Sequence, residues 1–312
     1  MDQTKTPEEV SASQVVLTSF LVDILDVFFS LIVTYLSGSV VMLAQLMEGI
    51  SDLTASGLLY VGLRRSEKKY DKTHPFGYGR ELYFWVLISA LVTFGITATL
   101  SIHFGWDRFL HPKPIADIDL ALLFLGITIF TNGYALFLSL RRLLKKHSLS
   151  QILKIFTRTS LIETKTTLIL DLMGTIASIL GIITLSFYRL TGDLRFDGLG
   201  SILIGVMVAI LAFILINNVK DLLIGKTASP EVESKIREHS LSIPEVKQVL
   251  GLKTMHIGSD KLLVNLDVQL ESALTTRQIE KLIDQIKDKI RSEIPSVRHI
   301  QVELETPKVR KT

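Results

Sequence analysis

Two carboxylates lie inside a segment that is otherwise apolar enough to cross a lipid bilayer. Glu48 and Asp52 interrupt the run Val40–Leu63 and stand four residues apart. On a helix they would share one face. A charged side chain at the bilayer centre costs about 2.5–3.5 kcal/mol on insertion scales, so two of them need partners, water or an ion. This helix is therefore the first candidate for a functional site.

Apolar runs of about 20 residues, the length that crosses a bilayer, recur through the first part of the chain. They predict an α-helical membrane protein with six transmembrane helices in a domain over residues 1–225, followed by a smaller domain over residues 226–312. The six predicted spans are about Val15–Leu36, Val40–Leu63, Tyr83–Trp106, Ile118–Leu140, Leu161–Tyr188 and Leu199–Ile216.

Positive residues concentrate in two of the predicted loops, which the positive-inside rule places in the cytoplasm. Six spans then put both termini in the cytoplasm, and we expect an integral protein of the plasma membrane. The net charge of +3 gives no indication of nucleic acid, and a chain without cysteine has neither disulfides nor thiolate metal ligands. The basic loop residues are Arg64, Arg65, Lys68, Lys69, Lys72 and Arg80, and Arg141, Arg142, Lys145, Lys146, Lys154 and Arg158.

The C-terminal domain shows both secondary-structure periods. Residues 261–270 and a second run near the end of the chain alternate between apolar and polar side chains, as half-buried strands do. Between them, apolar residues recur at helical spacing after a capping box of Thr275 and Gln278. An earlier helix near Pro230 and a strand over Val246–His256 complete the order α-β-β-α-β of a small, two-layer α+β domain.

The loop from Asp71 to Glu81 reads DKTHPFGYGRE. It closely resembles the His-Pro-Phe/Tyr-Gly-x-Gly-Arg/Lys-x-Glu signature of the cation diffusion facilitator family. The resemblance extends over about residues 15–306. Its further elements are Ser37-Gly38-Ser39, the Glu48/Asp52 pair, Asp171 in the fifth span, Asp197 before the sixth, Leu222-Leu223 and the α-β-β-α-β tail.

The resemblance implies transport rather than enzyme chemistry. Members of this family move divalent metal ions out of the cytoplasm as homodimers, usually in exchange for protons and without a prosthetic group. Their transport site lies between the second and fifth spans, which implies Glu48, Asp52, Thr167 and Asp171 as the metal ligands here.

Two of these positions depart from the family pattern, which often has His or Asp where this chain has Glu48 and Thr167. A neutral threonine hydroxyl is a poor metal ligand. Either three carboxylates hold the ion with a hydroxyl or water, or a neighbour compensates. Glu163, one turn before Thr167, and Gln45, three residues before Glu48, are the candidates.

A donor set made of oxygen without histidine suits hard cations, which favours Mn²⁺ or Fe²⁺ over Zn²⁺, although Zn²⁺ also accepts carboxylates. Metal binding needs deprotonated ligands and releases their protons, so paired acids would also explain an exchange of metal for protons. This remains a hypothesis about the Glu48/Asp52 pair.

Other readings of the chain stay open. A transport-inactive, metal-binding or regulatory member of the family is motivated by Thr167. A membrane hydrolase using paired carboxylates has no supporting catalytic motif, and a channel is a third alternative. Asp23 and Asp26 share a face of the first span and could line the ion path or pair with a neighbour, whereas Asn132 is expected to form an interhelical hydrogen bond.

The remaining polar residues predict structure more than metal binding. Asp71 and His74 could form an accessory metal site, but a tight turn is the simpler interpretation, with Arg80 and Glu81 pairing or anchoring the loop at the headgroups. The histidines of the C-terminal domain show no ligand spacing and are expected to face solvent. They are His239, His256 and His299.

Overall fold

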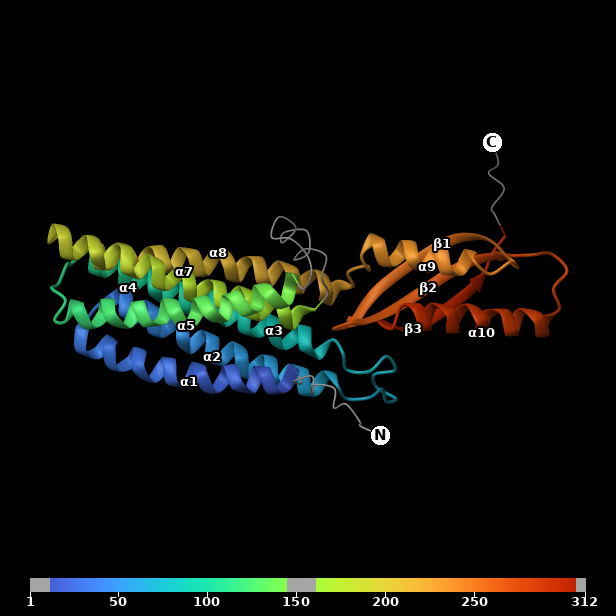
Figure 1. The fold of residues 1–312 in the computed structure, drawn as a ribbon, viewed down its shortest axis with the longest axis horizontal. Helices are drawn as coiled ribbons and strands as arrows, with labels where there is room; N and C mark the ends of the chain where they lie inside the picture. The colour runs from blue at the N-terminus through green and yellow to red at the C-terminus, as the bar shows by residue number, and fades with distance from the viewer. Residues whose placement is uncertain (1–11, 145–160, 307–312) are drawn as a thin grey trace, which may run out of the picture.

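The computed structural model describes residues 12–144 and 161–306, and its two parts lie end to end (Figure 1). Long helices pack side by side in one part, the helical bundle, and the chain after residue 225 forms the other, the soluble domain. The basic residues Lys145–Arg158 lie outside the described residues. The bundle helices are α1 (Ala12–Ser37), α2 (Val40–Ser66), α3 (Glu81–Val92), α4 (Thr99–Leu110), α5 (Ile118–Leu144), α7 (Ile162–Thr191) and α8 (Arg195–Ile224).

Four stretches of the bundle are long and apolar enough to cross a membrane, and they match the third to sixth predicted spans. The structure thus supports four of the six predicted spans. The helices α1 and α2 lie in the same bundle, but neither meets this criterion over the described residues. In α2 the reason is the polar insertion around Glu48 and Asp52. The four stretches are Glu81–Leu110, which joins α3, the π-helical segment η1 (Thr93–Ala98) and α4, and Ile118–Arg141, Ile162–Thr191 and Arg195–Ile224.

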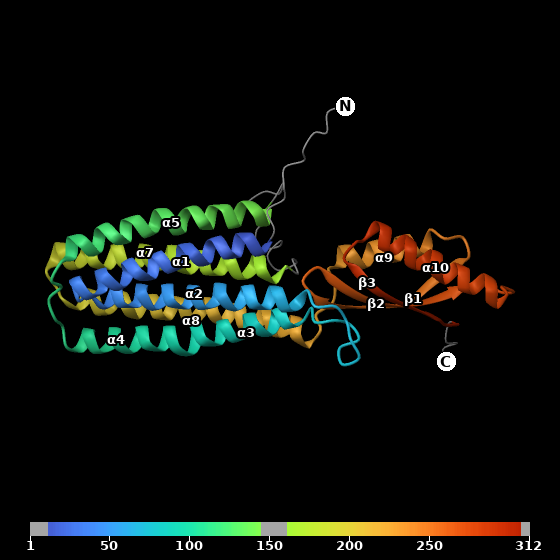
Figure 2. The ribbon, with the colours of Figure 1, turned by 90° about the horizontal axis from the view of Figure 1, so that it is seen from below.

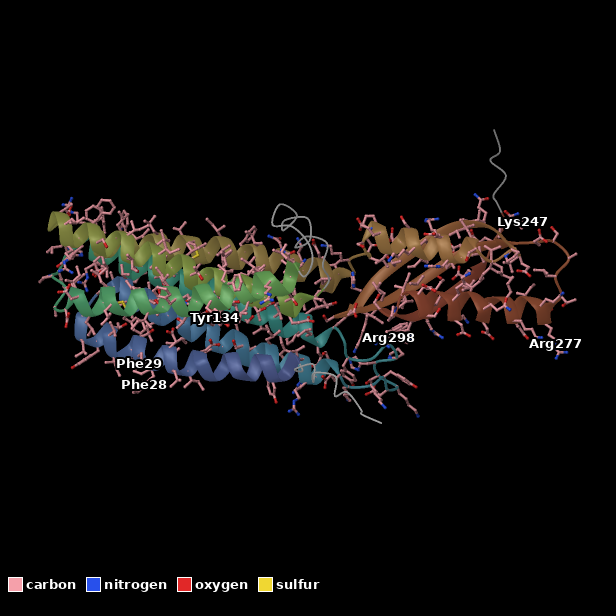
Figure 3. The ribbon with its side chains drawn as sticks, viewed as in Figure 1. Phe28, Phe29, Tyr134, Lys247, Arg277 and Arg298 are labelled. Atoms are coloured by element: carbon pink, nitrogen blue, oxygen red, sulfur yellow. The ribbon has the colours of Figure 1, made fainter. Side chains whose placement is uncertain are left out.

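Large apolar side chains cover the outside of the bundle. Phe130 is 81% exposed and Tyr134 is 65% exposed, both on α5. Phe28 and Phe29 extend outward from α1 (Figure 3). Exposed aromatic surface of this extent is unfavourable in water and favourable against lipid. The outer faces of α1 and α5 therefore have the character of lipid-facing surface.

A buried carboxylate fixes the start of α2. Gly38, at φ +65°, makes the turn from α1, and Ser39 caps the new helix. Asp197 of α8 accepts hydrogen bonds from the Ser39 hydroxyl (2.5 Å) and from the backbone N–H groups of Val40 and Val41 (3.1 Å each). An acid at a helix N-terminus satisfies free N–H donors and complements the helix dipole. Asp197 therefore joins α8 to α2 as a structural anchor.

The soluble domain has the predicted element order. Its sheet runs β1-β2-β3, with β1 and β2 antiparallel and β2 and β3 parallel. Both helices pack on one face of this sheet (Figure 2), and the capping box of Thr275 and Gln278 is present. The alternation predicted for residues 261–270 is confirmed, because Val264, Leu266 and Val268 are fully buried. The elements are α9 (Pro230–Leu241), β1 (Val246–Gly258), β2 (Lys261–Leu270), α10 (Thr276–Glu293) and β3 (Val297–Leu304).

The turn between β1 and β2 joins the soluble domain to the bundle. Ser259 donates a hydrogen bond to Glu163 Oε2 at the start of α7 (2.6 Å), and Lys261 donates to the carbonyl of Ser66 at the end of α2 (3.3 Å). Arg80 donates to the carbonyl of His256 (3.4 Å). These three contacts tie the β1–β2 hairpin to the end of α2 and to the starts of α3 and α7.

Candidate metal centre

One face of α2 carries the predicted acids. Gln45 is fully buried and Glu48 is 2% exposed, and the Gln45 amide donates to Glu48 Oε2 (3.5 Å). The carboxyl groups of Glu48 and Asp52 contact each other, as their spacing predicts. Among the described residues, no N–H or O–H donor reaches Glu48 Oε1 or Asp52 Oδ1, although both atoms are buried. Buried carboxylate oxygens without donors are costly unless a cation or a proton compensates them.

The acidic face of α2 approaches α7 at a glycine. A Cβ added to Gly174 would lie 3.3 Å from Glu48 Oε1 and 2.6 Å from the amide nitrogen of Asn132. A side chain at this position would therefore collide with the Asn132 amide. The glycine lets α2, α5 and α7 meet, as small residues do in membrane helix packing. Asn132 thus lies beside Glu48 in the interior of the bundle.

Asp171 lies one turn before Gly174 on α7. Its carboxylate accepts a hydrogen bond from Ser139 of α5, and it acts electrostatically on both Glu48 and Asp52. The structure therefore brings acids from α2 and α7 near one another. The side chains do not enclose an ion: across residues 12–144 and 161–306, no three His, Asp or Glu side chains gather in metal-ligand geometry.

Thr167 and Glu163 have other partners. The Thr167 hydroxyl donates to backbone carbonyls of its own helix, those of Glu163 (3.1 Å) and Thr164 (3.2 Å). The Glu163 carboxylate binds Ser259 of the soluble domain instead of extending toward α2. Of the two candidates to compensate for Thr167, only Gln45 lies next to the acid pair.

The loop acid Asp71 is held by its own loop. Its carboxylate accepts hydrogen bonds from the N–H groups of Thr73 and His74 (2.9 Å each) and from the hydroxyl of Tyr78 (2.8 Å). Donors from Thr73 and Tyr78 hold the pKa of Asp71 well below its usual range. Four donor groups, counting the Thr73 hydroxyl, thus satisfy this carboxylate, which fits the turn interpretation.

Two expectations for the charged residues near this loop need correction. Arg80 and Glu81 do not pair with each other: Arg80 binds the His256 carbonyl, and Glu81 lies 3.7 Å from Arg65. His256 does not face solvent, because it is 7% exposed where β1 meets the bundle. Burial, with Lys226 and Lys165 nearby, lowers the pKa of His256 to about 4.

Sequence reasoning missed Ser139 and the π-helical segment η1. Ser139 gives no local signal, because a serine in an apolar helix is common and its partner Asp171 is 32 residues away. In η1, Thr97 donates to Ser51 (3.0 Å), the residue before Asp52, and Ser51 donates to Thr93 (2.9 Å). Segments of π-helix occur often at functional sites.

Comparison with known families decides the assignment. Residues 16–224 match the family model described as the cation efflux transmembrane domain, and residues 228–307 match the cation efflux protein cytoplasmic domain. The chain belongs to the cation diffusion facilitator, or cation efflux, family. The family membership that the resemblance implied is thereby confirmed.

Several curated members of the family are similar to this chain. The human mitochondrial "Proton-coupled zinc antiporter SLC30A9" is 27% identical over 94% of the chain and 51% of its own length. "Zinc transporter ZitB" of Pectobacterium atrosepticum is 25% identical over 84% of the chain and 77% of its length. "Cation-efflux pump FieF" of Shewanella oneidensis is 24% identical over 80% and 78%. The chain spans about half the length of the SLC30A9 relatives that it matches.

Solved structures of the MamM C-terminal domain also align with part of the chain. A double variant of this domain covers 25% of this chain and 94% of its own, at 16% identity and a TM-score of 0.24. At this score the likeness carries no argument about the fold. The cytoplasmic-domain assignment depends on the family match and on the observed α-β-β-α-β order.

Proposed function

We propose that this protein carries a divalent metal cation out of the cytoplasm in exchange for protons, through a site between α2 and α7. Its ligands are Glu48 and Asp52 from α2, and Asp171 with Thr167 from α7. The observation that carries the proposal is the contact between the Glu48 and Asp52 carboxyl groups in the bundle interior. No donor among the described residues reaches Glu48 Oε1 or Asp52 Oδ1, and Asp171 acts electrostatically on both groups.

The same acids supply a reason for proton exchange. Two carboxyl groups in contact share protons when no cation lies between them, and they titrate as a pair. A divalent cation requires the deprotonated forms and releases those protons. The site returns to its protonated state after the ion leaves, so each cycle moves metal one way and protons the other.

The donor chemistry and the relatives favour different metals. Carboxylate, hydroxyl and amide oxygens around Glu48 suit Mn²⁺ and Fe²⁺, whereas two of the relatives described above are named for zinc. Zn²⁺ accepts carboxylate ligands, and affinity order alone does not select among these ions. All three belong in a transport assay, with Zn²⁺ as the first ion.

The proposed arrangement in the membrane includes α1 and α2 as spans. Their place among the four apolar helices and the exposed aromatic face of α1 support six crossings, with both termini in the cytoplasm. We place the domain boundary near Gly225, whose φ of +120° ends α8. A homodimer is supported by the cytoplasmic-domain family, whose model is named for a dimer. The plasma membrane stays a prediction, since one relative is named as mitochondrial.

Transport by the full chain in proteoliposomes tests this function. Zn²⁺, Mn²⁺ and Fe²⁺ are supplied in turn at a fixed pH gradient, and metal and proton movements are recorded together. We expect saturable metal flux with protons moving the opposite way. Metal flux without proton movement at every imposed gradient would contradict the exchange, and no flux of any metal would contradict transport.

A transport-inactive member of the family is the second candidate. It is favoured by Thr167, whose hydroxyl binds carbonyls of its own helix. Thr167→Asp and Thr167→His separate the two functions. If the wild-type chain is silent and either variant transports, the protein is a member that has lost transport through this position.

A further inference from the structure

The first helix directs two more carboxylates at the acidic face of α2. Asp23 Oδ2 accepts a hydrogen bond from the hydroxyl of Ser56 (2.8 Å), one turn beyond Asp52. Asp26 follows one turn later on α1, and its Oδ2 would lie 3.4 Å from a Cβ added to Gly49. Because α1 and α2 pack along each other, these contacts place both aspartates against the ladder of Glu48, Asp52 and Ser56.

The opposite face of α1 has a different character. Phe28 and Phe29 are 55% and 52% exposed and point away from the bundle (Figure 3). A helix with aromatic side chains outward and acids inward is oriented for lipid on one side and a polar interior on the other. The amphipathic pattern of α1 as a whole therefore orients Asp23 and Asp26 inward, in addition to their individual contacts.

A second observation connects these acids to a cation. Asp52 lies one turn before Ser56 on α2, and its buried Oδ1 receives no hydrogen bond from the described residues. Asp26 acts electrostatically on the neighbouring Glu48, which is 2% exposed. Asp23 also acts on both Glu48 and Asp52. Asp171 acts electrostatically on both acids as well. Such a cluster of buried acids needs compensating positive charge, which either bound protons or a cation can supply.

We propose that Asp23 and Asp26 of α1, facing Asp52 and Ser56, form a second divalent-cation position beside the α2–α7 site. Ser56 lies nearer than Asp52 to the end of α2 that meets the soluble domain. An ion held here enters from that end and passes along the ladder to Glu48 and Asp171. Carboxylate and hydroxyl oxygens are its ligands, which suits a hard or borderline divalent cation. The inference rests on the proposed transport function.

Metal binding to the full chain in lipid nanodiscs tests the second position. Bound Zn²⁺ and Mn²⁺ are counted per protomer by equilibrium dialysis for the wild type, the double variant Asp23→Asn/Asp26→Asn, and Asp171→Asn. Asp107→Asn, an exposed acid on α4, is the matched control. We expect the double variant to bind one ion fewer than the wild type, and the control to bind the same number.

The outcomes separate this inference from the proposed function. An unchanged ion count and affinity in the double variant, with a loss in Asp171→Asn, overturns the second position and leaves the α2–α7 site standing. Unchanged binding in both variants contradicts both proposals. The single variants Asp26→Asn and Asp26→Glu decide the matter if the double variant does not fold. We expect Asp26→Asn to weaken binding about 10- to 100-fold and Asp26→Glu to retain it.

Transport kinetics supply an independent readout. A loading position affects how well the cation is captured more than how fast it crosses. We expect Asp26→Asn to raise the KM for metal and to change the maximal rate little, whereas Asp171→Asn removes the maximal rate. A double variant with wild-type KM and wild-type ion count would overturn the proposal.

Discussion

The helical bundle and the soluble domain have opposite distributions of apolar and polar side chains between interior and surface. The bundle exposes Phe130 (81%) and buries the acids Glu48 and Asp197. The soluble domain buries Val264 and Ile286 completely and carries charged side chains such as Lys247, Arg277 and Arg298 on its outside (Figure 3). One chain thus uses two opposite patterns of burial, divided near residue 225.

Different forces stabilise the two halves. Apolar burial from water stabilises the soluble domain. Between helices in lipid, the burial of apolar surface contributes little free energy, because lipid tails are as apolar as the side chains. Close packing at small residues and hydrogen bonds between helices stabilise the bundle instead. Asp197 at the start of α2 and Ser139 on Asp171 are such contacts. Glu48 Oε1 and Asp52 Oδ1 differ from these two contacts, because no donor among the described residues reaches either atom.

The largest expected effect is on transport. Removal of one acid, by Asp52→Ala or Asp171→Ala, should abolish metal flux in proteoliposomes, because the metal loses a charged ligand that alanine cannot replace. The protein should stay folded and inserted, as judged by size-exclusion chromatography. Asp119→Ala, an exposed acid on α5, should retain transport. Full transport by both site variants would place the ion path elsewhere.

The apolar core of the soluble domain should dominate its own stability. Ile286→Ala creates a cavity under the sheet and should lower the free energy of unfolding of this domain by about 2–5 kcal/mol. Hydrogen exchange of the β2 amides in the full chain measures the loss. Leu241→Ala, at a side chain that is 48% exposed, should change it by less than about 0.5 kcal/mol. Equal effects would remove the contrast between core and surface.

A charge on the outer face should matter only in the bundle. Phe130→Arg places a cation at the centre of α5 and should cost about 2.5–3.5 kcal/mol of membrane insertion. Leu304→Arg, at an exposed residue of the soluble domain, should cost less than about 0.5 kcal/mol. The inserted fraction in microsomes compares them. Normal insertion of Phe130→Arg would show that this face of α5 does not contact lipid.

The smallest effect is expected where the two halves meet. The pKa of His256 is about 4 in the folded protein, and its ordinary value is 6.5. As the pH falls, this side chain therefore takes up a proton in the unfolded chain at a higher pH than in the folded protein. Stability is therefore unaffected above pH 6.5 and falls as pH drops from 6.5 toward 4. The loss is about 1 kcal/mol per pH unit within that window.

The variant His256→Phe should flatten this pH dependence, and His239→Phe on α9 should leave it unchanged. Thermal unfolding of the full chain between pH 7 and pH 5 measures both. A wild-type pH profile in His256→Phe would assign the titration to another group.

Local patterns in the sequence predict local structure well. The strand over residues 261–270, the capping box of Thr275 and Gln278, and the shared face of Glu48 and Asp52 all follow from spacings of about ten residues or fewer. Each of these features has its physical cause within one element. The order α-β-β-α-β could therefore be predicted without knowledge of the fold.

Features that depend on distant partners could not be predicted. Ser139 meets Asp171 across 32 residues, and Glu163 meets Ser259 across 96. The burial of His256 depends on the bundle covering an end of β1 that would otherwise face water. In α2 the sequence pattern predicts a span, yet its polar insertion lowers its apolar content below that of the four other spans.

The position of the bound metal tests the central claim most directly. Anomalous diffraction from crystals of the full chain grown with Zn²⁺ locates the ion without reference to activity. We expect a peak inside the bundle within about 2.0–2.6 Å of carboxylate oxygens from both α2 and α7, Glu48 or Asp52 on one side and Asp171 on the other. A Zn²⁺ peak found only in the soluble domain, with the acids of α2 and α7 turned apart, would contradict the account.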